Sequence, residues 1–92
     1  MIEITAIHLQ GGESHEHIAN LRWRQTSTSE TGQSTRQAVV DWLRESKTNQ
    51  AVVADNGSWV YVAVVSEGPG APYLRTHADG VLSDNLLNLP TF

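Results

Sequence analysis

Cysteine is absent from this chain of 92 residues, so neither a disulfide nor a thiolate metal site can support its fold. Basic charge is scarce: six Lys and Arg stand against ten Asp and Glu, for a formal net charge of −4. That balance gives no general attraction to nucleic acid or to an anionic membrane surface. The sequence also has no apolar run of about 18 residues, the length of a membrane span. We therefore expect a fold held together by hydrophobic packing.

We expect no targeting segment. The N-terminal residues 1–10 show no basic region followed by an apolar core and a cleavage site, so we expect a cytoplasmic protein. The length predicts a single small domain over residues 1–92. With 39% hydrophobic residues the composition is that of a folded chain, although a domain of this size has a thin core.

Hydrophobic periodicity predicts a hairpin in the first quarter of the chain. Residues 2–10 are rich in β-branched side chains, but their apolar face changes partway, which indicates a twist, a bulge or burial on both sides. Residues 17–25 alternate, with Leu21 and Trp23 on the apolar face. A short connection favours antiparallel pairing of these two strands. Residues 26–33 are small and polar, and we predict a loop there.

One helix is expected at about residues 35–46. Ser34 begins an S-x-x-Q capping box, in which Ser34 would cap the helix and Gln37 would reach back. Val39, Trp42 and Leu43 then follow at helical spacing, so one face is apolar. We predict Trp42 as the buried anchor of this helix.

The second half of the chain predicts further strands. Residues 51–65 form two apolar runs around an Asn-Gly pair, which suits a tight type I′ hairpin turn. The run 59–65 is apolar on both parities and predicts a central strand with Trp59 and Val62 in the core. Residues 73–76 predict another strand and residues 78–80 a turn. Ser83 or Asp84 could cap a single helical turn in the leucine-bearing end of the chain, where Pro90 prevents a longer helix.

The resulting order, β-β-α-β-β-β, predicts an α+β fold: a small, mainly antiparallel sheet with one helix packed on one face. The predicted core comprises Trp23, Trp42, Trp59, Leu21, Leu43 and Val62.

Histidines provide the candidate metal site. In a strand, His15 and His17 would point the same way, roughly 7 Å apart, which is a chelating spacing that needs at least one further ligand. His8 on the neighbouring strand could supply it, and His77 with Asp79 is a second source. The alternative is that His15 and His17 are polar residues at the mouth of a hairpin, with one of them bonded to the turn backbone. No other cofactor is indicated.

Catalytic and nucleic-acid patterns are weak by comparison. No serine lies in a G-x-S-x-G motif, and a domain this small has little volume for an enclosed pocket, so we do not expect an enzyme. Arg22 and Arg24 share a strand face, but Trp23 has the opposite parity, whereas RNA-binding sheets carry aromatic and basic residues on one face. We expect no nucleic-acid partner and no membrane partner.

Several blocks of the sequence resemble a family of small bacterial, especially actinobacterial, and phage proteins that is described as a domain of unknown function. These blocks are HEHI at 15–18, Trp23, STR at 34–36, YLRTHADG at 73–80 and DNLLNLP at 84–90. The resemblance covers nearly the whole chain and implies one compact domain. It implies no activity and no catalytic residue.

Protein binding is the function that needs the least special chemistry. Open sheet edges invite pairing with another chain, and the apolar surface of residues 59–65, of the first strand and of the leucine-bearing end exceeds what one helix can cover. We therefore expect a protein-binding module, either a homodimer or a partner of a host protein if the chain is of phage origin. The alternative is an accessory domain that binds a metal or a small ligand through His15 and His17.

Overall fold

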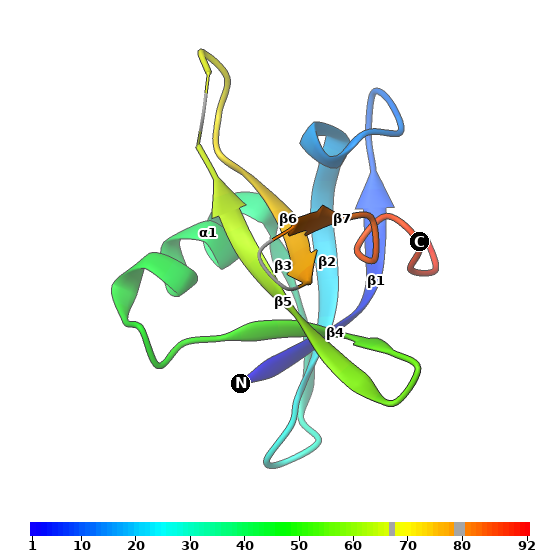
Figure 1. Cartoon of the computed structure of the whole chain (residues 1–92), viewed down its shortest axis with the longest axis vertical. Helices are drawn as coiled ribbons and strands as arrows, with labels where there is room; N and C mark the ends of the chain where they lie inside the picture. Colours follow the sequence, from blue (N-terminus) through cyan, green and yellow to red (C-terminus); the bar gives the residue numbers. More distant parts are fainter. Residues whose placement is uncertain (67, 79–80) are drawn as a thin grey trace.

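The computed structural model describes residues 1–66, 68–78 and 81–92, and these residues form an α+β fold (Figure 1). A single sheet carries the architecture, with one α-helix and one short 3-10 helix beside it. The elements in chain order are β1 (Ile2–Leu9), η1 (His15–His17), β2 (Ile18–Gln25), β3 (Thr31–Thr35), α1 (Arg36–Glu45), β4 (Ala51–Asp55), β5 (Ser58–Val65), β6 (Tyr73–Ala78) and β7 (Val81–Ser83).

The sheet has seven strands in the order β3-β2-β1-β4-β5-β6-β7. Every neighbouring pair is antiparallel except β1 and β4, which run parallel, so the sheet is mixed but mainly antiparallel. The sequence pattern missed the two outermost strands. The predicted loop at 26–33 contains the start of β3, and the expected helical turn near Ser83 is preceded by β7. Both strands are short, and neither shows the apolar alternation by which a strand is recognised.

Curvature brings the two ends of the sheet towards the same helix. Helix α1 contacts β2 and β3 near one end of the strand order, and β5 and β6 near the other. A flat sheet could not place these four strands against one helix, so the sheet curls around α1. We call the face that packs on α1 the inner face, and the opposite one the outer face.

A β-bulge in β1 explains the change of apolar face in the sequence. Ile4 pairs with Trp23 and Ala6 pairs with Arg22, so Thr5 has no partner of its own in the register. The extra residue shifts the alternation of side chains between the two faces by one residue. Ile4 and Ile7, which have opposite parity in the sequence, are therefore both fully buried.

Strand β1 is hydrogen-bonded along both of its edges. One edge pairs with β2, while the other is divided between two segments: Ile2 and Glu3 pair with β4, and Ile7 pairs with the C-terminal segment, residues 84–92. The amide of Ile7 donates to the carbonyl of Pro90 at 2.9 Å, and the amide of Phe92 donates to the carbonyl of Ile7 at 3.0 Å. The C-terminal segment thereby satisfies backbone groups of β1 that β4 does not reach.

The predicted helix is present, but its cap differs from the expected one. Thr35 is the N-cap, and its hydroxyl accepts from the amide of Ala38 at 3.1 Å. Ser34 instead lies in β3, where its hydroxyl accepts from Nε1 of Trp23 at 3.0 Å. The helix is anchored by Val39 and Val40, which are buried, whereas the predicted anchor Trp42 is only partly buried.

The core lies between the inner face of the sheet, α1 and the C-terminal segment. Leu21, Val62 and Leu86 are buried there, and several of the predicted core residues pack against it while partly exposed, namely Trp23, Trp42 and Leu43. The prediction that Trp59 is a core residue is wrong, because the residue is 44% exposed. Trp59 lies on the outer face of β5, where no second layer of the described chain covers it.

None of the helices in the described part of the chain is long and apolar enough to cross a membrane.

Substituting Gly32 by alanine should test the packing of β3 on β2. A Cβ at Gly32 would lie 2.8 Å from Cε2 of Trp23, closer than such atoms approach. We expect the overpacking to cost about 1–3 kcal/mol, more than the roughly 0.4–1 kcal/mol gained by stiffening the unfolded chain. Urea unfolding measures the difference.

The matched control is Gly70→Ala, because a Cβ at Gly70 meets nothing within 4 Å. This variant should be at least as stable as the wild type, with a gain of up to about 1 kcal/mol from the stiffer unfolded chain. Equal stabilities for the two variants would contradict the close contact between Gly32 and Trp23.

Candidate functional site

The two histidines of the HEH stretch lie in η1, not in a strand, which corrects the expected parallel arrangement of their side chains. His17 is bound within its own turn: its Nδ1 is 2.6 Å from the hydroxyl of Ser14, whose amide also points to it at 3.3 Å. The imidazole covers Gly12, where a Cβ would lie 2.6 Å from Cε1 of the ring. His17 thus caps a turn of 3-10 helix and explains the glycine that precedes it.

His15 points the other way and is buried, with 7% of the residue exposed. Its Nε2 has no hydrogen-bond partner in the described part of the chain, and Oδ1 of Asp84 lies 3.8 Å away. Burial and the Arg75 guanidinium lower the pKa of His15 below its ordinary value, while the carboxylates of Asp84 and Glu16 oppose that shift only in part. This environment therefore favours the neutral form of the His15 imidazole.

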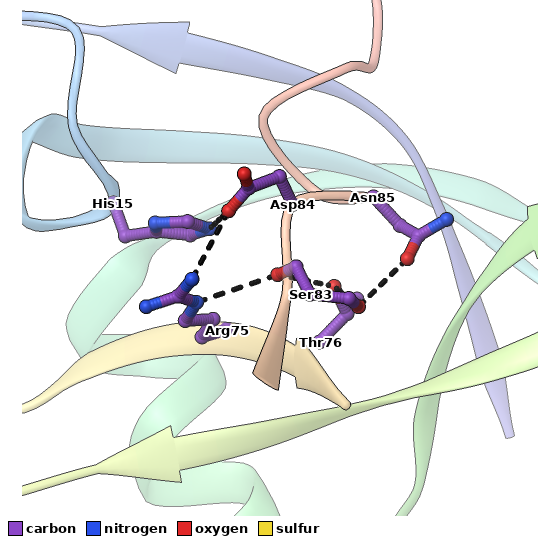
Figure 2. Close-up of polar contacts among 6 residues, drawn as sticks. All are labelled: His15, Arg75, Thr76, Ser83, Asp84 and Asn85. Atoms are coloured by element: carbon purple, nitrogen blue, oxygen red, sulfur yellow. Dashed lines mark hydrogen bonds and ion pairs between the residues drawn. The ribbon is translucent and has the colours of Figure 1, made fainter. Parts of the chain in front are cut away.

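A polar cluster surrounds His15 and joins three distant parts of the chain (Figure 2). Arg75 of β6 donates to Oδ1 of Asp84 at 3.1 Å and to the carbonyl of Ser83 at 3.4 Å. Thr76, which is fully buried, donates to the same carbonyl at 3.1 Å. The hydroxyl of Ser83 in turn donates to Oδ1 of Asn85 at 2.7 Å. These contacts fasten the start of the C-terminal segment to β6 and so place Leu86 in the core.

His8 and His77 lie outside the cluster around His15. His8 of β1 is bonded through Nδ1 to the carbonyl oxygen of Phe92, and its ring packs against the Phe92 ring with centroids 5.7 Å apart. His77 of β6 pairs with Tyr61 across the sheet, and its expected companion Asp79 lies outside the described residues. His8, His15 and His17 thus have three separate environments. Within residues 1–66, 68–78 and 81–92, no three His, Cys, Asp or Glu side chains are grouped as metal ligands would be.

A row of residues paired by register crosses the outer face of the sheet, and its central member, Val52, is fully buried. Residues that pair directly across two strands share one face, so the register defines the row step by step. From β3 to β7 it runs Thr31, Arg24, Glu3, Val52, Tyr61, His77, Leu82. Sequence reasoning missed it because it depends on strand order, which no local pattern of residues specifies.

The two halves of this row differ in character. On β2 and β1 a salt bridge joins Arg24 to Glu3 at 2.7 Å. On β5 to β7 the row consists of Tyr61, His77 and Leu82, and two of these are large hydrophobic residues in solvent: Tyr61 is 49% exposed and Leu82 47%. Trp59 lies two residues before Tyr61 and on the same face of β5. We call Trp59, Tyr61, His77 and Leu82 the outer-face patch. It contains three of the four large hydrophobic residues that are exposed among the described ones.

The depressed pKa of His15 predicts a pH-dependent stability. The unfolded chain takes up a proton on this imidazole near the ordinary value of 6.5, whereas the folded chain resists doing so. The stability from neutral His15 is complete above that pH and is lost as the pH falls below it, by at most about 1.4 kcal/mol per pH unit for one proton. Urea unfolding at pH 7.5 and below 6 should show the loss in wild type and less of it in His15→Gln.

The variant His17→Gln serves as the control, because it retains the buried His15 and changes only the exposed turn. Between pH 7.5 and below 6 it should lose as much unfolding free energy through His15 as wild type does. If His15→Gln and wild type lost stability in parallel, the assignment of the effect to His15 would be wrong.

Comparison with known proteins gives one match. No curated protein and no solved structure is significantly similar to the chain. A family model described as "Protein of unknown function (DUF3892)" matches residues 3–90, a span that includes the histidine turn, the outer-face patch and the Arg75–Asp84 contact. The chain therefore belongs to the DUF3892 family.

Proposed function

We propose that this protein acts by binding protein, and that its first partner is a second copy of the same chain, held through the outer-face patch. The observation that carries the proposal is the exposure of Trp59, Tyr61 and Leu82 side by side on one face, each between 44% and 49% exposed. Aromatic residues are enriched at protein interfaces because they bury much area at little conformational cost. In a thin fold, leaving three such residues in water forgoes stability that burial would provide.

Charge does not prevent a second copy from occupying the patch. The chain carries a formal net charge of −4, so two copies repel each other wherever their charged surfaces meet. The patch limits this cost, because Trp59, Tyr61 and Leu82 carry no charge. The ion pairs beside it, Arg75 with Asp84 and Arg24 with Glu3, each bring together opposite charges. A two-fold axis through the patch would place β5 of one copy over β6 and β7 of the other, as in a sandwich of two sheets.

Area sets the expected strength. With each large side chain about half exposed, the three together present on the order of 300 Å². Stable interfaces bury roughly 800 Å² on each partner, so the patch would supply the centre of an interface and not the whole of it. The proposed dimer is therefore weak and reversible.

Sedimentation over a range from about 1 μM to about 1 mM tests this proposal. Wild type should move from monomer to dimer within that range, and Trp59→Ser with Tyr61→Ser should stay monomeric throughout. Both substitutions are on the solvent side of β5, so the fold should survive them. Thr31→Ala, at the far end of the same row, is the control that should dimerise like wild type. A wild type that stays monomeric at the highest concentration would refute the proposal.

A further inference from the structure

A cavity of about 270 Å³ lies on the inner side of the sheet, between α1 and strands β2 and β3. It is on the opposite face from the outer-face patch and is separate from the histidine turn. Its walls are mostly apolar, with two indoles and two polar side chains; they include Ile2, Trp23, Gln25, Ser34, Val39 and Trp42. Ala38, which is exposed on α1, completes the lining.

The Trp23 indole is held in place before any ligand arrives. Gly32 lies directly opposite it in the register, and the absence of a side chain there lets the ring lie against the β3 backbone. Nε1 of Trp23 donates to the hydroxyl of Ser34, so its hydrogen bond is already made. A wall fixed by two independent contacts loses little further freedom on binding, which favours affinity.

The second indole comes from the helix. Trp42 is partly buried, and the helix end that carries it is tied down, because Nδ2 of Asn49 donates to the Trp42 carbonyl at 2.8 Å. The cavity thus has an aromatic side chain on the sheet and another on the helix. Such rings favour a planar aromatic guest, which they contact through offset or edge-to-face stacking.

The polar groups of the lining limit the charge and the hydrogen-bonding groups of the guest. No lining residue is ionisable, and the charge nearest to Gln25 is the N-terminal ammonium, so a cationic guest would lose its hydration without gaining a counter-charge. The Ser34 hydroxyl accepts from Trp23 and keeps its own proton to donate. Oε1 of Gln25 accepts from the N-terminal amino group at 3.4 Å, which leaves the Gln25 amide nitrogen as a second donor. A guest with one hydrogen-bond acceptor would satisfy either donor.

Volume sets the upper size. A dry cavity of roughly 150 Å³ can hold benzene, so a cavity of about 270 Å³ has room for two fused rings and not for a drug-sized molecule. From these features we infer that the cavity between α1 and β2–β3 binds a small neutral planar aromatic compound of one or two rings that carries a hydrogen-bond acceptor.

Quinoline is a suitable probe, because it is planar, has two rings, is neutral at pH 7.5 and accepts one hydrogen bond. The readout is the set of three indole N–H signals in a ¹H–¹⁵N spectrum of the full chain. Quinoline should shift the signals of Trp23 and Trp42 in a saturable way at concentrations up to about 5 mM, and leave that of Trp59 unmoved. The cation 1-methylquinolinium, of similar shape but with its ring nitrogen no longer able to accept a hydrogen bond, should bind at least tenfold more weakly.

Ala38→Leu is the test variant, because it fills the cavity from an exposed helical position and retains the Thr35 cap. It should weaken quinoline binding at least tenfold while its dispersed spectrum shows that it is folded. Trp59→Ser, on the other face, is the control and should bind quinoline as wild type does. Absence of shifts at Trp23 and Trp42, equal shifts at all three indoles, or unchanged binding by Ala38→Leu would overturn the inference. None of these outcomes depends on whether the chain dimerises.

Discussion

The fold depends on the hydrogen bonds along the two edges of β1. This strand lies near the middle of the strand order, with β2 on one side, and on the other side β4 at its first residues and the C-terminal segment near Ile7. The bulge at Thr5 allows both halves of β1 to direct isoleucines into one core. Without the C-terminal segment, backbone groups near Ile7 would lose their partners and Leu86 would leave the core.

The two faces of the curved sheet carry different kinds of side chain. The inner face encloses the core and α1, and its only aromatic residue from β2, Trp23, lies at the margin where the cavity opens. The outer face carries the Arg24–Glu3 ion pair on β2 and β1, and the outer-face patch on β5 to β7 beside Arg75. Surfaces of distinct chemistry therefore face away from each other, and occupation of one does not obstruct the other.

Local sequence signals predicted the elements that depend on local physics. The helix followed from the spacing of Val39, Trp42 and Leu43, and the turn at Asn56 from the Asn-Gly pair, where both residues indeed have positive φ. Strand β3 was not predicted, because its residues TGQST are polar. Its pairing with β2 depends on the close packing of Gly32 against Trp23, which no local pattern indicates. Trp59 was misassigned because alternation cannot tell which apolar face of a strand meets solvent.

The candidate sites were less accessible to sequence reasoning. The HEH stretch indicated a metal site, but the turn at Ser14 sends His15 and His17 in different directions. The partners of His15 are Arg75 and Asp84, about sixty and seventy residues later, and only the curl of the sheet brings them together. The outer-face patch and the two-indole cavity likewise combine residues from several strands, and their existence depends on strand order.

The divided edge of β1 has a consequence for how the chain folds. A strand that takes its partners from the middle and from the far end of the sequence cannot be completed by local zipping, because two long loops must close first. The hairpin of β4 and β5 has its own tight turn and can form early. The pairing of β1 is complete only when β4 and the C-terminal segment have both reached it. Because loop-closure entropy is lost before such distant contacts form, this arrangement should make folding slower than that of a chain of equal length with mainly local contacts.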